Sequence, residues 1–412
     1  MSKLTTCWRY VLVLSIVFTF SGCQSTDTKL TRLSGWSSNP VEEKLVAGVL
    51  ADFHREKPAV NFKYEPIPGN YTEKIQLMLG THTAPDVFYL RGETAPSYMR
   101  FNVLEPLNQY AADTTFRIDD FYPALLKSFQ KGDTLYGVPK DFNPYVLFYN
   151  KAMFGEAGLT HPPQNWKELE AFSRRMTKDT NGDGKPDQYG LVLEPTIEMI
   201  MAFVYQNGGD FQKEDGTLGI LDKNFLDALE YYVRLYRTGA ATIPSDLSAK
   251  WNGECFGTKK CAMVISSGWL IPELRTNYND VDWGVAELPV GRQKATIVFT
   301  NAYAMPKESI HKKDGWQIID YLTSQDGLKS VVKQGLALPP RRSVAQNLGL
   351  YNDPVKRVFL QSAEFARTFQ TTLPERWYEE ASVALQMIYF DNKTPREAME
   401  ALNRQIESGI LQ

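Results

Sequence analysis

Residues 135–158 read LYGVPKDFNPYVLFYNKAMFGEAG. This stretch predicts two extended runs separated by a polar bend and followed by a helix. Pro139 and Pro144 restrict the backbone at the two ends of the bend, because proline limits both its own φ and the residue before it. Asn150 can cap the helix at its start, and Gly158 can end it in a left-handed conformation.

A polar bend between two prolines has little use inside a core, but it suits a segment that crosses between two lobes. We interpret it as the first crossover of a two-lobed protein, with a ligand cleft beside Asp141 and Tyr145. A buried loop within one α/β domain is the alternative that these residues leave open. The length of 412 residues is sufficient for two domains.

The composition is that of an ordinary soluble globular chain, with 43% hydrophobic and 23% charged residues. The net charge of −3 argues against a nucleic-acid-binding protein, since such proteins are normally basic. Aromatic residues make up 12% of the chain, which is compatible with stacking surfaces as well as with apolar cores.

The N-terminus has the pattern of an export signal. Lys3 and Arg9 give a positive start, and residues 11–20 form an apolar run too short to span a bilayer. The run ends in Ser-Gly before Cys23, which resembles a bacterial lipoprotein signal with Cys23 as the lipidated residue. We therefore exclude residues 1–23 from the fold and expect a protein anchored by lipid outside the cytoplasm. An ordinary secretory signal with an incidental Cys23 is the alternative.

Once Cys7 leaves with the signal and Cys23 carries lipid, Cys255 and Cys261 remain. An even pair at close spacing in an oxidising compartment predicts a disulfide. Its loop is small, so the expected stabilisation is only about 2–3 kcal/mol. Two buried thiols are the competing interpretation, and the 4 His residues make a zinc site unexpected.

The first part of the mature chain predicts a β-α-β-α-β order, which is typical of a parallel sheet with flanking helices. Ligands of such sheets bind at the carboxyl ends of the strands. Those ends are Trp36 to Asn39, Gly69 to Tyr71 and Tyr89 to Glu93. Further along, the apolar run Ala262 to Ile265 predicts a buried strand that ends at Gly268 and Trp269.

The stretch DTNGDGKPD at 179–187 has the oxygen-ligand spacing of an EF-hand-like calcium loop, although Gly190 stands where that loop carries its bidentate Glu. Three clustered aspartates would repel one another without a cation, so we expect a structural calcium ion. A metal-free loop of Asx turns is the alternative. The expected ligands are Asp179, Asn181, Asp183 and Asp187, with the backbone carbonyl of Lys185.

Several stretches, in this order and spacing, resemble the extracellular sugar-binding lipoproteins of bacterial ABC transporters, the broad group that includes maltose-binding protein. They are APDVFYL (84–90), LYGVPKDFNPYVLFYNKAMF (135–154), PPQNWKELEAFSRRMT (162–177), FGTKKCAMVISSGWLIPEL (256–274), WGVAELPVG (283–291) and TNAYAMPKES (300–309). The resemblance implies a type II-like periplasmic-binding-protein fold, with two α/β lobes that close over a sugar and perform no catalysis. We divide the mature chain into an N-terminal lobe of 24–140 plus 299–342 and a C-terminal lobe of 141–298 plus 343–412.

Sugar recognition needs aromatic faces for the apolar ring faces and planar polar groups for hydroxyls. The resemblance places stacking aromatics at Trp269 and Trp377, for which a core role is the alternative; Trp36 and Trp251 are weaker candidates. The family often has Asp after the third strand, where this chain has Arg91 and Glu93. The remaining candidates, on loops or element ends, are Ser38, Glu42, Glu93, Asp141, Asn143, Tyr145, Asn301, Tyr303 and Arg341.

These observations predict a monomeric receptor that delivers a disaccharide or short oligosaccharide to a membrane permease. The sequence has no Gly-x-Ser-x-Gly elbow, His-Glu-x-x-His motif or phosphate-binding glycine loop. The main alternative is a lipid-anchored glycoside-active enzyme, whose carboxylate pair would be among the 48 Asp and Glu residues. A structural or adhesion lipoprotein is a third class, and it would need no hinged cleft.

Overall fold

The computed structural model describes residues 30–37, 40–213, 215–333, 338–373 and 377–409. The predicted signal and Cys23 lie outside this part. Among the helices it describes, none has the length and apolar character needed to cross a membrane.

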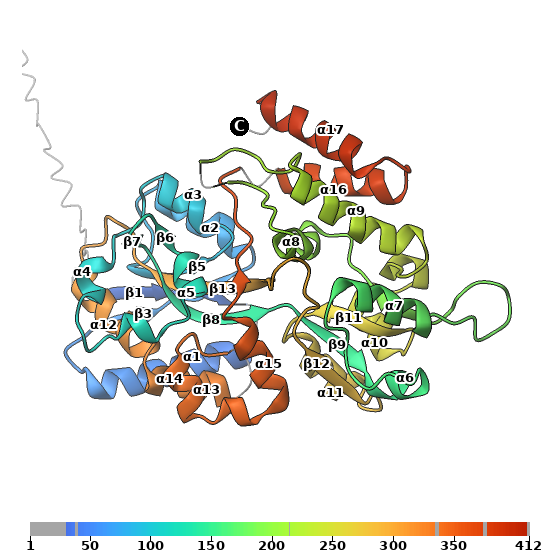
Figure 1. The fold of residues 1–412 in the computed structure, drawn as a ribbon. Coiled ribbons are helices and arrows are strands. Elements are labelled where there is room, and N and C mark those ends of the chain that lie inside the picture. Colours follow the sequence, from blue (N-terminus) through green and yellow to red (C-terminus); the bar gives the residue numbers. More distant parts are fainter. Residues whose placement is uncertain (1–29, 38–39, 214, 334–337, 374–376, 410–412) are drawn as a thin grey trace, which may run out of the picture.

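The N-terminal lobe is built on a sheet of six strands in the order β14-β13-β5-β1-β3, with β8 paired to β13 (Figure 1). The strands are β1 (Thr31–Ser34), β3 (Phe62–Tyr64), β5 (Val87–Arg91), β8 (Val138–Pro144), β13 (Thr296–Ala304) and β14 (Ala366–Arg367). β1 is parallel to β3 and β5, with α1 (Pro40–Glu56) and α2 (Tyr71–Gly80) between them in sequence. The predicted β-α-β-α-β unit is therefore confirmed.

The C-terminal lobe has a second sheet of four strands, in the order β10-β11-β9-β12. They are β9 (Val146–Asn150), β10 (Tyr189–Val192), β11 (Cys261–Ser266) and β12 (Trp283–Ala286). All six residues of β11 are buried, as its uninterrupted apolar sequence predicts. β9 runs antiparallel to β11 and β12.

The other helices surround these sheets. They are α3 (Ala95–Arg100), α4 (Asn108–Ala111), α5 (Pro123–Lys127), α6 (Lys151–Glu156), α7 (Trp166–Met176), α8 (Ile197–Gln206), α9 (Lys223–Arg237), α10 (Asn252–Gly257), α11 (Leu270–Asn277), α12 (Lys312–Leu322), α13 (Gln325–Lys333), α14 (Arg342–Asn347), α15 (Pro354–Ser362), α16 (Trp377–Tyr389) and α17 (Pro395–Glu407). Two short ladders complete the fold, β2 (Trp36–Ser37) with β4 (Ile67–Pro68) and β6 (Gln130–Lys131) with β7 (Thr134–Leu135).

The first crossover is a strand and not the bend that the prolines suggested. β8 pairs antiparallel with β13 along its whole length, and β9 follows it into the second lobe (Figure 1). The register shifts between Asn301 and Ala302, so Pro139 lies next to an irregularity where a missing N–H is tolerated. The ends of α6, the helix after β9, are as predicted. The Asn150 side chain caps its start, and Gly158, just beyond its end, is left-handed with φ +63°.

β8 and its partner β13, which we call the hinge strands, are the first two crossovers, and residues 363–373 form a third crossover bonded to both lobes. Gln370 donates to the carbonyl oxygens of Gly92 and Ser128, at 2.6 and 2.8 Å, in the N-terminal lobe. On the other side, the Thr372 N–H donates to Gln212 Oε1 at 2.9 Å. This segment lies later in the chain than the lobe boundary after residue 342 that we predicted.

The position of two helices shows the reason for that difference. α14 and α15 lie below the first sheet in Figure 1, and Val344 and Leu360 pack in an apolar cluster with Tyr122 and Phe142. α16 and α17 instead pack with the core of the C-terminal lobe. Residues 343–362 therefore lie at the boundary of the lobes: α14 packs beside the N-terminal lobe, whereas α15 also packs through Phe359 against Phe148 of the C-terminal lobe.

The predicted disulfide is wrong, since Cys255 and Cys261 are both free and buried. Cys255 lies on α10 and Cys261 begins β11, and both thiols pack in an apolar cluster with Phe148 and Leu274. Burial is the main cause that raises the pKa of the Cys255 thiol to about 11. Each cysteine therefore acts as a small hydrophobic residue, which was the competing interpretation.

Candidate functional site

Side chains from the two lobes and from the strands that join them come together where β5, β10 and β11 end. We call this group the interlobe site. It consists of Arg91, Glu93, Lys140, Asp141, Asn143, Tyr145, Glu198, Trp269, Phe299, Asn301 and Tyr378. Its position at carboxyl strand ends is the one that open α/β sheets use for ligands.

Trp269 supplies an accessible aromatic face. It follows β11 directly, and 45% of its surface is exposed. Its ring is held edge-on by Tyr145 and Phe299, with centroid distances of 6.1 and 5.3 Å. A half-exposed aromatic ring that neighbouring rings hold in place can stack on an apolar ring face.

Gly268 allows the hinge strand to approach Trp269. A Cβ atom at this position would lie 2.5 Å from Oδ1 of Asn143 on β8. A side chain on residue 268 would therefore displace Asn143. Asn143 therefore lies against the residue that precedes Trp269.

The hinge strands carry a compact polar group. Asn301 Nδ2 donates to Asp141 Oδ1 at 2.9 Å, across the β13–β8 ladder. Lys140 forms an ion pair with Asp141, and the two side chains are only 10% and 15% exposed. The Lys140 ammonium also lies 5.3 Å from the ring centroid of Trp36 and 4.7 Å from that of Tyr89. The sequence analysis missed Lys140, although its position next to Asp141 on a crossover was a usable signal.

Glu93 is an acidic residue on the N-terminal side of the interlobe site. Glu93 follows β5, and its Oε2 lies 3.5 Å from Nε of Arg91. Although 27% of the Glu93 side chain is accessible, Oε2 itself is covered and makes no hydrogen bond. Burial is the main cause that raises the pKa of Glu93, and the negative charge of Glu198 raises it further. Such perturbed carboxyl groups are frequent at functional sites.

Glu198 and Tyr378 lie on the C-terminal side of the interlobe site. Glu198 lies in the first turn of α8, where the positive end of the helix dipole favours a carboxylate. Tyr378 is 38% exposed, and its hydroxyl donates to Glu198 Oε1. Burial first, and then the charge of Glu198, raise the pKa of Tyr378. Neither residue was among the predicted site residues.

Three predicted ligand residues lie in cores instead. Trp377 is only 4% exposed and packs on Phe211, with a centroid distance of 4.6 Å. Its neighbour on α16, Tyr378, is turned outward. Tyr303 is 6% exposed in the N-terminal core, where its ring lies edge-on to that of Tyr89.

Arg341 is the third predicted ligand residue that is buried away from the interlobe site. It is 6% exposed, and its guanidinium donates to the carbonyl oxygens of Thr323 and Phe116 at 2.6 and 2.8 Å. It also lies over the ring of Phe121, 4.1 Å from the centroid, and 3.7 Å from Asp120. Arg341 therefore ties segments of the N-terminal lobe together. Ser38 and the side chain of Glu42 lie outside the described part of the structure.

The loop at 179–187 is closed by its own acidic side chains. Asp179 accepts hydrogen bonds from the N–H groups of Gly182 and Gly184 at 2.6 and 2.8 Å, and Asp187 accepts from the Thr180 N–H at 3.1 Å. The Gly184 N–H is the main cause that lowers the pKa of Asp179. These are the Asx turns of the metal-free alternative. Within the described ranges, no group of three or more His, Cys, Asp or Glu is arranged to hold a metal ion, and calcium binding stays a prediction.

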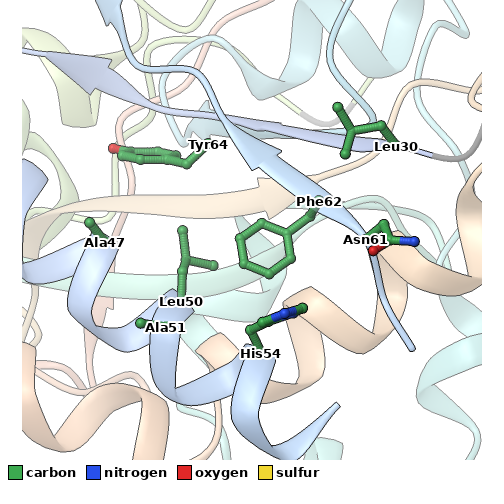
Figure 2. Close-up of a pocket in the computed structure, with 8 residues that line it drawn as sticks. All are labelled: Leu30, Ala47, Leu50, Ala51, His54, Asn61, Phe62 and Tyr64. Atoms are coloured by element: carbon green, nitrogen blue, oxygen red, sulfur yellow. The ribbon is translucent and has the colours of Figure 1, made fainter. Parts of the chain in front are cut away.

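A pocket of about 680 Å³ lies elsewhere, between α1 and the edge strand β3 (Figure 2). Its lining residues are Leu30, Ala47, Leu50, Ala51, His54, Asn61, Phe62 and Tyr64. It lies at the start of β1 and β3, away from the carboxyl strand ends, and it contains none of the residues of the interlobe site. We do not assign the solute to this pocket, because its wall from α1 is mostly aliphatic.

Comparison with known proteins agrees with this architecture. The chain is 24% identical, over 83% of its length and 84% of the relative's, to a putative binding protein of Brucella abortus. It is 19% identical to the galactooligosaccharide-binding protein of Bacillus subtilis, over 96% and 94% of the two chains. The structure of the sugar-binding protein MalE from Xanthomonas citri superposes with a TM-score of 0.81 at 24% identity, covering 92% of this chain and 96% of that one.

The two-lobed fold predicted from the sequence is thus confirmed by a solved structure. The model of the family described as bacterial extracellular solute-binding protein matches residues 36–329, which is more than half of the chain. This chain therefore belongs to the bacterial extracellular solute-binding proteins.

Proposed function

We propose that this protein binds a disaccharide or short oligosaccharide at the interlobe site and delivers it to the permease of an ABC transporter. The observation that carries the proposal is the half-exposed ring of Trp269, which Tyr145 and Phe299 hold in place at the strands that join the lobes. Aromatic stacking and paired hydrogen bonds are what sugar recognition requires. The names of relatives that bind galactooligosaccharides and arabinooligosaccharides support the same ligand class.

A thermal-shift screen of the mature protein, followed by calorimetry, tests this proposal. A ligand that binds only the folded state raises the melting temperature. The panel should contain disaccharides, short oligosaccharides and mannitol, since one relative is named a mannitol-binding protein. We expect a saccharide to raise the melting temperature and to lose most of its affinity in Trp269→Ala. A panel without any saccharide hit would overturn the proposal.

The same proposal holds that the protein does not hydrolyse its ligand. Family membership supports this, because the named relatives are binding proteins. Pure protein incubated with its disaccharide should return it intact. Steady release of monosaccharide would favour the alternative of a lipid-anchored glycoside-active enzyme, and Glu93 and Glu198 would then be the first carboxylates to replace.

We also propose that a lipid on Cys23 anchors a monomer to the outer face of the cytoplasmic membrane or to another extracytoplasmic membrane surface. The signal pattern at residues 1–23 supports the anchor. Cys23→Ser should move the protein from the membrane fraction to the soluble fraction. Light scattering of the soluble form should give the mass of one chain, whereas a mass of two chains would contradict the monomer.

Finally, we propose that the 179–187 loop binds one structural calcium ion through Asp179, Asn181, Asp183, Asp187 and the Lys185 carbonyl. The spacing of oxygen ligands supports it. Chelation should lower the melting temperature of the wild type and leave Asp183→Ala unchanged. An equal response, or no response, in the two proteins would favour the metal-free Asx turns.

A further inference from the structure

The N-terminal lobe exposes two large apolar side chains around one groove. Phe101 and Ile310 are 70% and 77% exposed, and both line a groove of about 450 Å³. Exposed apolar side chains that gather in one place mark an interaction site, whereas singly scattered ones need no explanation. We call this place the pole surface, and its residues are His82, Asp86, Phe101, Lys307, Glu308 and Ile310.

The pole surface lies at the amino ends of the parallel strands, opposite the interlobe site. Asp86 directly precedes β5, whereas Arg91 at the other end of β5 belongs to the interlobe site. A strand of this length separates its two ends by about 16 Å. β13 runs antiparallel to β5, so the segment after Ala304 returns to the pole surface and brings Lys307 and Ile310 to it.

The chain enters the fold beside the pole surface. The N–H of Arg32, the second residue of β1, donates to Asp86 Oδ2 at 2.8 Å, and the Arg32 guanidinium donates to the Thr83 carbonyl at 3.0 Å. The hydroxyl of Ser309 donates to the other oxygen of the Asp86 carboxylate at 2.6 Å. Figure 1 shows β1 on the side of the N-terminal lobe that is turned away from the C-terminal lobe. The start of β1 is therefore bonded directly to the pole surface.

The length of chain before β1 limits how far the pole surface can lie from a membrane. With a lipid on Cys23, as proposed above, seven residue steps join the anchor to Leu30. A fully extended chain spans at most about 25 Å over seven steps. A lipid anchor on Cys23 would therefore hold the pole surface close to the bilayer.

The polar groups of the pole surface do not oppose contact with lipid headgroups. Asp86 is only 8% exposed and already accepts two hydrogen bonds, and Glu308 pairs with His82. Lys307 is exposed, and a lysine near a bilayer is attracted to anionic lipid while its long stem covers apolar surface. The strength of binding to a membrane interface grows with the apolar area that the interface buries.

Building on the proposed lipid anchor at Cys23, we propose that the pole surface rests on the phospholipid bilayer, with Phe101 and Ile310 inserted among the headgroups. The lipid and the pole surface then hold the N-terminal lobe at two places, which fixes its orientation on the membrane. In this orientation the interlobe site, at the other end of β5, points away from the bilayer and stays open to solutes.

Dye accessibility on vesicles tests the proposal with the full lipidated protein. Phe101→Cys and Ile310→Cys each carry an environment-sensitive dye on the new cysteine, since Cys255 and Cys261 are buried. The vesicles contain phosphatidylethanolamine and phosphatidylglycerol, and flotation recovers them with the bound protein. We expect the emission of both dyes to shift to the blue, and their quenching by aqueous iodide to fall several-fold, relative to the same variants made without lipid by Cys23→Ser.

Phe390→Cys is the matched control, because Phe390 is 59% exposed and directly follows α16 of the C-terminal lobe. A dye at position 390 should stay fully accessible to iodide on the same vesicles. Adding Ile310→Asp to the protein labelled at position 101 should restore quenching, because a charged side chain opposes insertion, whereas adding Phe390→Asp should not.

Three outcomes would overturn the proposal. If the protein floats with the vesicles but the dyes at positions 101 and 310 are quenched as readily as the dye at position 390, the anchor stands and the bilayer contact falls. Protein that does not float would overturn the anchor and, with it, the bilayer contact. Shielding on native membranes but not on pure lipid would assign the pole surface to a membrane protein in place of lipid.

Discussion

At the scale of single residues, neighbours in sequence have opposite roles at this site. Trp377 and Tyr378 follow each other on α16, yet the first is 4% exposed in the core and the second is 38% exposed. Successive helical residues point about 100° apart, so a shift of one position exchanges a core ring for a surface ring. A stacking residue on a helix therefore cannot be assigned from loose alignment alone.

Trp269→Ala and Trp377→Ala should separate binding from stability. Trp269 is half exposed, so its loss should weaken sugar binding about tenfold or more, by removal of a large apolar contact, with little change in melting temperature. Trp377 fills a core position, so its loss should cost about 3–5 kcal/mol of stability. Calorimetry and thermal melts measure the two effects. A strongly destabilised Trp269→Ala with normal affinity would show that Trp269 is a packing residue.

Glu93→Gln should stabilise the ligand-free protein in a pH-dependent way. The folded state raises the pKa of Glu93 above 4.5, mainly by burial, so the folded protein holds this proton more tightly than the unfolded chain. Stability is therefore lost as the pH rises above about 4.5 and through the folded pKa. We expect the variant to melt at the same temperature as the wild type near pH 4 and roughly 1–3 °C higher near pH 7. A pH-independent difference would contradict this explanation.

At the scale of elements, the hinge consists of β8 and β13. The register shift in their ladder lies beside Asp141 and Asn301, two of the predicted ligand residues. β8 tolerates Pro139 because the ladder with β13 shifts register beside it, between Asn301 and Ala302, and Pro144 is the last residue of the strand. Asp141 and Asn301 then face each other across the ladder and share a hydrogen bond. A bend in the chain could not hold them so rigidly, since a strand partner restricts both backbones.

Gly268→Ala tests the contact between the hinge strand and the second lobe. The new Cβ would lie 2.5 Å from Asn143 Oδ1, so Asn143 must move, and we expect sugar affinity to fall several-fold. Gly155→Ala on α6 is the matched control, because a Cβ there meets no atom within 4 Å. It should leave affinity unchanged and stabilise the helix by about 0.5–1 kcal/mol. Unchanged affinity in Gly268→Ala would mean that Asn143 takes no part in binding.

At the scale of the whole molecule, the third crossover is bonded to both lobes and touches the ligand region. Gln370 donates to the carbonyl of Gly92, which directly precedes Glu93, while Thr372 bonds to Gln212 in the other lobe. A solute that contacts both lobes favours the arrangement in which they are closest, through its differential contacts with the two states.

Small-angle X-ray scattering should therefore show a smaller radius of gyration when the identified sugar is present. At the same sugar concentration, the radius of gyration of Trp269→Ala should fall less, because a smaller fraction of the variant is bound to sugar. A saturated wild type with an unchanged radius of gyration would contradict ligand-driven closure and indicate a site that is closed before the ligand arrives.

The sequence by itself determined the features that depend on local chemistry. The alternation of strands and helices, the buried run of β11, the cap at Asn150 and the left-handed Gly158 all follow from periodicity and turn residues. It also placed Trp269 just after the buried strand β11, because the end of an apolar run is visible in the sequence, whereas Asp141 lies within β8 and not in the predicted bend.

Only the tertiary structure decided which distant side chains meet. Glu198 and Tyr378 share a hydrogen bond although 180 residues separate them, because α8 and α16 pack in one core, and no local pattern encodes that contact. Arg341 is buried because carbonyl oxygens from separate segments, at Phe116 and Thr323, converge on it. Cys255 and Cys261 remain thiols because packing, and not spacing, sets their environment. Burial and charge are sums over the whole neighbourhood of a residue, and that neighbourhood exists only after folding.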